Sequence, residues 1–430
     1  MPSSPLRRAA SFGAALALVA PPLAAQQASV PPVPARNAQV RQALAALKTD
    51  NDWTLQQQAS ICEIAAPPFK EAARAAEYRR RLEALGLTNV RIDAEGNVIA
   101  ERRGSGDGPT IVLSAHLDTV FPEGTDVTVK RTDGRMVAPG IGDDCRGLAV
   151  LLSVARAMRD ARVATDGTIL FVGTVGEEGP GNLRGVRHLF SGPMKDSIDY
   201  FISVDGTGLG ITSGAVGSHR YKVTYKGPGG HSYGAFGMPN PVHALGRAIA
   251  KVSEFQVPRD PRTTFSVGVI SGGTSVNSIA FEASMEVDMR SESEASLGEV
   301  DAKFQRAIRD ALAEEKARWP NSRAALELVI DTIGLRPAGT QPVTAPIVQA
   351  AIRSRAAVLE GTGVAADGEP GASSTDSNIA ISLGVPAVTI DGGGRGRGAH
   401  ALVESYEDGP NGWLGPQWAL LLVTTLAGVR

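Results

Sequence analysis

The sequence predicts an α/β protein with a mainly parallel central sheet, interrupted by an inserted α+β unit. Strand-like apolar runs alternate with helical segments before about residue 217 and after about residue 335, as in parallel sheets with helices on both faces. Between these positions the order is strand, helix, strand, strand, helix, strand, which is the ferredoxin-like arrangement. With 430 residues, 43% of them hydrophobic, the chain is long enough for two domains.

The first 25 residues have the features of an export signal. Arg7 and Arg8 precede an apolar run that ends in the small residues Ala24 and Ala25. We therefore expect cleavage near this point, a linker over residues 26–39, and an exported protein that is periplasmic or secreted. The paired arginines leave a twin-arginine route open. No apolar run is long enough to span a bilayer, so no membrane anchor is expected.

The first part of the catalytic domain is expected over residues 40–216. Helical periodicity dominates up to about Arg80, and a further helix follows a glycine-rich loop near residue 147. Strand-like runs end in polar residues near 118, 178 and 205. Ligands of open α/β sheets bind at the carboxyl ends of the strands, so these polar ends form the candidate site.

The inserted domain is expected over residues 217–335, and the second part of the catalytic domain over residues 336–430. The insert is predicted to contain strands at 219–227, 263–273, 278–290 and 324–334, and helices at 239–255 and 296–319. The second part of the catalytic domain is predicted to contain helices at 345–359 and 415–428 and a strand before the glycine-rich segment that starts at 392.

Two strand ends carry residues suited to metal chemistry. His116 and Asp118 are two apart, so their side chains can touch, and a carboxylate beside a histidine orients the imidazole toward a metal. Glu177 and Glu178 are adjacent carboxylates between glycines. Bringing such a pair together is costly unless a positive charge, such as a metal ion, stands nearby.

Further candidate ligands lie in glycine-rich segments or at a strand end. Asp143 and Asp144 lie between glycines, where one can bind a cation and the other can cap the following helix. Asp205 ends a strand, and His400 follows the segment GGGRGRGA.

These motifs, HLDTVFP, GIGDDCRG, GEEG, SVDGTG and a closing GAH followed by glutamate, resemble in order those of the co-catalytic dizinc exopeptidases, the family of peptidase T, aminoacylase and glutamate carboxypeptidase. The resemblance implies two Zn²⁺ ions, replaceable by Co²⁺ or Mn²⁺. The implied ligands are His116 and Asp205 on one ion, Glu178 and His400 on the other, and Asp143 bridging both. Glu177 would be the general base that takes a proton from a metal-activated water, and Asp118 would orient His116.

The resemblance extends to the insert, which would serve as a lid and dimerisation domain, so a homodimer is expected. His231 falls at a histidine that stabilises the oxyanion, often across the dimer. Asn277 and Arg290 match positions that contact substrate in some members. Arginine suits a substrate carboxylate, although a structural salt bridge is an alternative for Arg290.

The expected activity is hydrolysis of a terminal amide bond of a small peptide, by an aminopeptidase, tripeptidase or carboxypeptidase. Hydrolysis of N-acyl amino acids on the same site is the alternative. The 43 basic and 45 acidic residues are well mixed and give a net charge of −2, which argues against a nucleic-acid partner. Two cysteines, Cys62 and Cys145, exclude a disulfide scaffold and a cysteine zinc site, and leave their own pairing open.

The sequence also contains features that bear on two other classes of function. Ser232 lies in a GxSxG pattern, but a nucleophile elbow needs a strand directly before the serine and a helix directly after it. The sequence predicts a strand that ends near Tyr225 and a helix that begins near Pro239. A non-catalytic solute- or metal-binding protein would keep the ligands and lose the base, whereas Glu177 is present.

Overall fold

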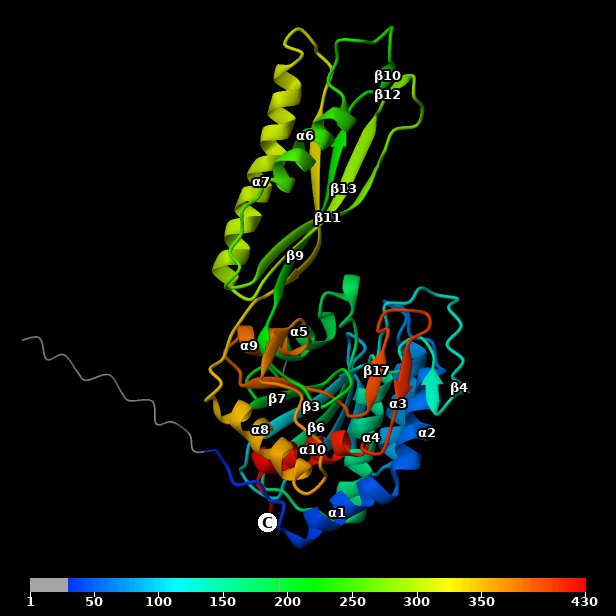
Figure 1. Ribbon diagram of the computed structural model, residues 1–430, viewed down its shortest axis with the longest axis vertical. Helices are drawn as coiled ribbons and strands as arrows, with labels where there is room; N and C mark the ends of the chain where they lie inside the picture. Colours follow the sequence, from blue (N-terminus) through cyan, green and yellow to red (C-terminus); the bar gives the residue numbers. More distant parts are fainter. Residues whose placement is uncertain (1–29, 193) are drawn as a thin grey trace, which may run out of the picture.

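The computed structural model describes residues 30–192 and 194–430, so the predicted export signal lies outside the described residues. Figure 1 shows two units arranged along the long axis of the molecule. The larger unit contains an eight-stranded, mainly parallel sheet, and the smaller contains an antiparallel sheet with two helices. The predicted fold class is therefore confirmed. Among the described helices, none is long and apolar enough to cross a membrane.

The large sheet has the strand order β1-β2-β6-β3-β7-β16-β8-β15. Its strands are β1 (Thr88–Ile92), β2 (Val98–Arg102), β3 (Thr110–His116), β6 (Thr168–Thr174), β7 (Tyr200–Val204), β8 (Ile211–Ala215), β15 (Gly371–Ser373) and β16 (Ala387–Ile390). The central strands β6, β3, β7 and β16 pair in parallel. Their carboxyl ends consequently lie along one edge of the sheet, as the sequence predicts.

Helices cover both faces of this sheet. One face packs against α1 (Ala38–Thr49), α2 (Asn51–Cys62), α3 (Ala72–Ala84), α4 (Cys145–Asp160), α8 (Pro346–Leu359) and α10 (Leu414–Ala427). The other packs against α5 (Arg184–Ser191) and α9 (Ser377–Ser382). Along β3, Ile111 and Leu113 enter the first core and Val112 enters the second. Burial on both faces explains why the strand is a continuous apolar run.

The smaller unit follows the predicted order of strands and helices. Its elements are β9 (Gly217–Lys226), α6 (Pro241–Ser253), β11 (Thr263–Gly272), β13 (Glu282–Ser291), α7 (Glu294–Ala317) and β14 (Glu327–Arg336). The strands form an antiparallel sheet in the order β11-β13-β9-β14. The two helices pack on one face of this sheet around Tyr225, Met285 and Phe304. The end of this unit that lies farthest from the larger unit carries two short paired strands, β10 (Gly230–His231) and β12 (Ser278–Ile279) (Figure 1).

A small sheet that the sequence did not predict joins distant loops of the larger unit. It contains β4 (Lys130–Thr132), β5 (Arg135–Val137), β17 (Arg395–Arg397) and β18 (Ser405–Glu407), in the order β17-β18-β5-β4. Because β18 pairs with β5, the loop that carries His400 lies beside the loop that carries Asp143.

Candidate metal centre

The candidate ligands gather at the carboxyl edge of the large sheet. His116 is the last residue of β3, Glu177 and Glu178 follow β6, and Asp205 follows β7. The sheet register places the ends of these strands side by side. Chain segments far apart in sequence therefore meet at one point, because parallel strands end at the same edge.

His116 is fixed by the backbone and side chains around it. Its Nδ1 lies 3.1 Å from the carbonyl oxygen of Asp118, which can only accept a hydrogen bond, so Nδ1 carries the proton. Its Nε2 lies 2.9 Å from Oδ1 of Asp143, to which the protonated ring donates a hydrogen bond. Burial lowers the pKa of His116, but the hydrogen bond with Asp143 and the charges of the nearby aspartates outweigh it, so the pKa lies well above its usual value. Because Nδ1 is held by the carbonyl oxygen of Asp118, Nε2 is the nitrogen that would lose its proton and bind a metal ion.

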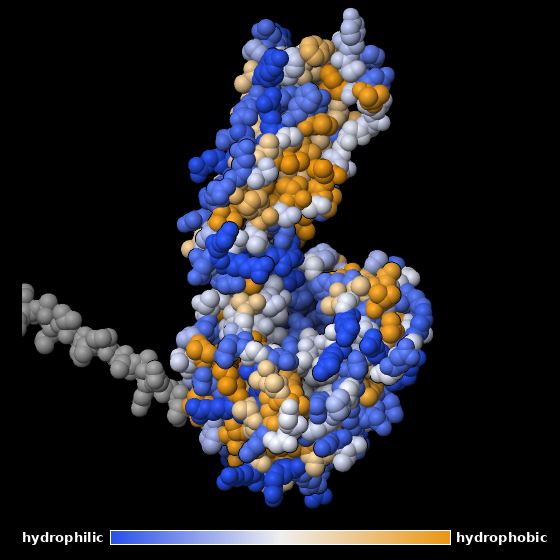
Figure 2. Space-filling model, viewed as in Figure 1, coloured by the Kyte–Doolittle hydropathy of each residue, from blue (hydrophilic) through white to orange (hydrophobic). Residues whose placement is uncertain are grey.

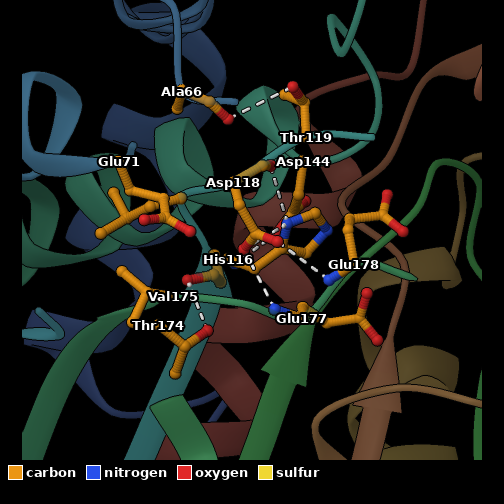
Figure 3. Close-up of polar contacts among 12 residues, drawn as sticks. Ala66, Glu71, His116, Asp118, Thr119, Asp144, Thr174, Val175, Glu177 and Glu178 are labelled. Carbon is orange, nitrogen blue, oxygen red and sulfur yellow. Dashed lines mark hydrogen bonds and ion pairs between the residues drawn. The ribbon is translucent and has the colours of Figure 1, made fainter. Parts of the chain in front are cut away.

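Asp118 ties the two strand ends together. Its side chain is fully buried, and its carboxylate accepts hydrogen bonds from the backbone N–H groups of Glu177 at 3.1 Å and Glu178 at 2.9 Å. Figure 3 shows Asp118 between His116 and the two glutamates. The distance from its Oδ1 to Nδ1 of His116 is 3.7 Å. Asp118 thus lies where it can orient both the histidine and the glutamate pair.

The adjacent aspartates point to different partners. Asp144 is the N-cap of α4, and its carboxylate accepts from the N–H of Gly147 at 2.9 Å and from the N–H of His116 at 3.0 Å. The alternative that one aspartate caps the helix is therefore confirmed for Asp144. Asp143 lies between the two histidines, with Oδ2 at 3.2 Å from Nε2 of His400. Burial raises the pKa of Asp143, but hydrogen bonds with both imidazoles more than offset this and hold it below its usual value.

His400 is the second histidine of the candidate metal centre, and it contacts Asp143 and Glu178. Its side chain is 54% exposed, and its Nε2 lies 3.0 Å from Oε1 of Glu178. Hydrogen bonds with Asp143 and Glu178 raise its pKa to about 10. The backbone of His400 has φ of 66°, in the left-handed region that a histidine adopts only where its surroundings hold it.

Potential ligand atoms fall into overlapping sets whose members lie within 4.8 Å of one another. These sets are His116, Asp143 and Asp205; Asp143, Glu178 and His400; and His116, Glu177 and Glu178. The first two share Asp143 and together contain the five ligands that the sequence resemblance implies. Imidazole nitrogens and carboxylate oxygens are ligands that zinc accepts. The residues present therefore fit two neighbouring cations with one shared carboxylate.

The pKa of Asp205 is shifted by its buried position and its acidic neighbours. Burial, and then the charge of Asp143, raise its pKa well above the usual value. Like charges this close favour a nearby cation, because each carboxylate otherwise disfavours ionisation of the others.

Glu177 has a partner that sequence reasoning missed. Its Oε1 lies 3.1 Å from Nη1 of Arg336, the last residue of β14, and the guanidinium also donates to the backbone carbonyl of Glu177. Both side chains are almost completely buried. Burial raises the pKa of Glu177, and the positive charge of Arg336 lowers it. The negative charge of Glu178 raises it again, so that the pKa of Glu177 lies above its usual value. Nothing local in the sequence links these residues, which are 159 positions apart.

Glu404 is a second residue that the sequence analysis did not assign. Its carboxylate accepts three backbone hydrogen bonds, from Gly140 at 2.9 Å, Gly142 at 2.7 Å and Asp143 at 2.9 Å. Burial raises its pKa to about 7, even though these N–H groups act to lower it. The glutamate in the closing motif was the available signal, since it lies four residues after His400.

A cavity of about 560 Å³ opens beside these residues, in the hollow between the two units (Figure 2). Asp143, Glu177, Glu178, Asp205 and His400 line one side of it. The other walls come from the strand ends and loops of the larger unit and from three arginines, Arg220, Arg290 and Arg336. Arg290 is thus placed in the cavity, where the sequence predicts a substrate contact.

His231 and Asn277 lie elsewhere. His231 belongs to β10 and Asn277 immediately precedes β12, so the structure brings the two residues together at the far end of the insert, away from the cavity of the same chain (Figure 1). Ser232 follows β10 in a turn, and α6 begins only at Pro241. This geometry lacks the strand-to-helix turn of a serine nucleophile.

Comparisons with known proteins identify the family of the chain. The model of the family described as Peptidase family M20/M25/M40 matches residues 112–411. N-acetylcysteine deacetylase of Bacillus subtilis is 27% identical over 276 residues, which are 60% of this chain and 67% of that protein.

Two solved structures share the fold. A tripeptidase from Staphylococcus aureus superposes with a TM-score of 0.69 at 21% identity, over 87% of this chain and 98% of that chain. The Bacillus subtilis YXEP protein, described as a dinuclear metal binding peptidase, superposes with a TM-score of 0.62 at 21% identity, over 89% and 99%.

Proposed function

Because the chain belongs to Peptidase family M20/M25/M40 and is a metal-dependent hydrolase, we propose that it hydrolyses a terminal amide bond of a small peptide or of an N-acyl amino acid. The observation that carries the proposal is the pair of ligand sets that share Asp143, with Glu177 beside them. The bound cations would be two Zn²⁺ ions, with Co²⁺ or Mn²⁺ as substitutes.

In this proposal each residue has a separate role. His116 and Asp205 would hold one cation, Glu178 and His400 would hold the other, and Asp143 would contact both. When bound, such cations polarise a carbonyl group and make water more acidic. Asp118 keeps Nδ1 of His116 protonated, so that Nε2 remains available as a ligand.

Glu177 is proposed as the general base. Its carboxylate lines the cavity, and Arg336 fixes Oε1, while Oε2 has no hydrogen-bond partner among residues 30–192 and 194–430. From this position it can take a proton from an attacking water and pass it to the leaving amine.

The test separates catalysis from metal binding. Glu177→Ala should lower kcat by at least about 100-fold, the usual contribution of a positioned base, while the protein keeps its metal content by mass spectrometry. The exposed Glu123→Ala is a matched control and should leave both unchanged. A chelator should abolish activity, and Zn²⁺ or Co²⁺ should restore it. Unchanged hydrolysis by Glu177→Ala, or full activity after confirmed metal loss, would refute the scheme.

We propose that the protein acts as a homodimer in which His231 serves the site of the partner subunit. Nδ1 of His231 accepts hydrogen bonds from the N–H groups of Tyr233 and Gly234, at 3.2 and 3.3 Å. The neutral ring must then carry its proton on Nε2, which suits an oxyanion donor. Strand β11 lies at the sheet edge and exposes Val269 and Ile270, and Figure 2 shows apolar side chains gathered on this part of the insert.

Export is proposed from the first 25 residues alone. Mass measurement of the protein recovered outside the cytoplasm should give an N-terminus near Gln26, and recovery of the full-length chain from the cytoplasm would contradict it.

A further inference from the structure

A pocket of about 520 Å³ lies at the edge of the large sheet that is opposite the metal centre. Arg102, the last residue of β2, lines this pocket and pairs with Ile169 near the start of β6. Glu177 follows the other end of β6. The pocket and the cavity of the metal centre are therefore separate, and they share no lining residue in the described part of the chain.

Arginines dominate the polar lining of the pocket. Arg102 and Arg103 come from the end of β2, Arg159 comes from the last turn of α4, and Arg162 follows this helix. Among the lining residues that the structure describes, Glu101 is the one acid. Four arginines and one glutamate thus surround a single hollow.

Two of the four arginines have an acidic partner. Nε of Arg103 donates to Oε1 of Glu101 at 3.0 Å, and Nε of Arg159 donates to Oδ1 of Asp160 at 2.7 Å. Each of these pairs is neutral as a whole. The charge of the pocket is therefore set by the two arginines that remain.

Arg102 and Arg162 make no ion pair within residues 30–192 and 194–430. The guanidinium of Arg102 donates to the backbone carbonyl of Val163 and lies 3.5 Å from Oγ1 of Thr165. Its side chain is only partly exposed, and burial lowers its pKa. A partly buried cation without an acid is unfavourable, so an anion in the pocket would stabilise it.

The rest of the lining contains apolar side chains and hydroxyl groups. The apolar part consists of Leu85, Leu87, Ala155, Met158 and Val163. The hydroxyl groups belong to Thr88, Ser105 and Thr165. Apolar side chains next to a few charged groups suit a ligand that has an organic body as well as an anionic group.

We propose that this pocket binds a small organic phosphate, with the phosphate group held between Arg102 and Arg162. Guanidinium groups match the oxygen atoms of a phosphate and can bind them bidentately. A phosphate dianion balances the charge of both arginines, whereas a carboxylate balances only one of them. Binding at this place is separate from the proposed hydrolysis and does not depend on it.

Calorimetry of the metal-loaded protein tests the site with phenyl phosphate as the probe. Phenyl phosphate should bind at least about tenfold more tightly than benzoate, because it brings a second charge to the arginines. It should also bind more tightly than inorganic phosphate, because the ring covers apolar lining. Circular dichroism checks the fold of each variant described below.

Arg102→Gln and Arg162→Gln should each weaken the binding of phenyl phosphate about tenfold or more, since each removes a charge-assisted hydrogen bond. Arg162 is exposed, so its replacement leaves the internal contacts of Arg102 intact. Arg353→Gln removes an exposed positive charge from α8, outside the pocket, and should bind as wild type.

Removal of the metal separates this site from the metal centre, because phosphate oxygens can also bind metal ions. A chelator should leave the affinity for phenyl phosphate unchanged, and so should Arg290→Gln in the cavity of the metal centre. Absence of binding, loss of binding on chelation, or equal affinity for phenyl phosphate and benzoate would overturn the inference. Wild-type affinity in both Arg102→Gln and Arg162→Gln would overturn it as well.

Discussion

Glu177 is held by a single strong partner, the guanidinium of Arg336. The two side chains are 7% and 5% exposed, so solvent contributes little to their interaction. Nη1 of Arg336 also donates to Oγ of Ser374 at 3.0 Å, which fixes the guanidinium from a second side. A base that must approach a water from one direction gains from such a support, because a small misplacement is costly in rate.

Arg336→Gln should therefore lower kcat by about 10- to 100-fold with a smaller change in KM, since it leaves the base present but poorly positioned. Arg336→Lys, which keeps the charge, should recover part of the loss. In a Glu177→Gln background Arg336→Gln should have no further effect, because the two residues act as a unit. Kinetics of the four variants, with metal content measured for each, provide the check, and additive losses would show that Arg336 acts independently of Glu177.

At the scale of elements, the metal centre depends on loops that hold one another. The loop between β17 and β18 supplies both His400 and Glu404. The carboxylate of Glu404 accepts hydrogen bonds from three backbone N–H groups in the loop that carries Asp143. One loop thus contributes a candidate ligand and also fixes the shared carboxylate. Groups that support metal ligands in this way commonly tune metal affinity.

Glu404→Gln should weaken metal binding by about 10- to 100-fold. In the wild-type protein both carboxylate oxygens of Glu404 accept backbone N–H groups, whereas the N–H₂ group of glutamine cannot accept a hydrogen bond and would leave a donor unpaired. Affinity is measured by competition with a chromogenic chelator, and circular dichroism checks that the fold is retained. Glu407→Gln, three residues further on at the protein surface, is the matched control and should bind metal as wild type. Wild-type affinity in Glu404→Gln would exclude this supporting role.

At the scale of the whole molecule, the features that the sequence predicted are those that depend on short, local patterns of residues. The fold class follows from the alternation of strands and helices. His116, Glu178 and Asp205 could be proposed as ligands because each lies at or just after the end of a strand, in a short motif. Arg336 was missed, since its contact with Glu177 depends on two units meeting across a cavity. The predicted division of the chain at residues 217 and 335 stays a prediction, which limited proteolysis would test.

The position of His231 leads to the prediction about assembly. His231 lies at the far end of the insert, and the cavity lies at the opposite end (Figure 1). His231 is therefore poorly placed to act on the cavity of its own chain. In a dimer, His231→Ala and Glu177→Ala would damage complementary halves of each site. A heterodimer of the two variants would have one intact site, formed by Glu177 of one chain and His231 of the other.

Coexpression of the two inactive variants with different tags should therefore restore about one quarter of the wild-type activity when the chains pair at random. The purified heterodimer alone should show about half of it, because one of its two sites is intact. Light scattering establishes the oligomeric state of each sample, and the double variant His231→Ala/Glu177→Ala paired with wild type is the control for subunit exchange. A monomer in solution, or no recovery in a verified heterodimer, would mean that His231 does not complete the site of a partner subunit.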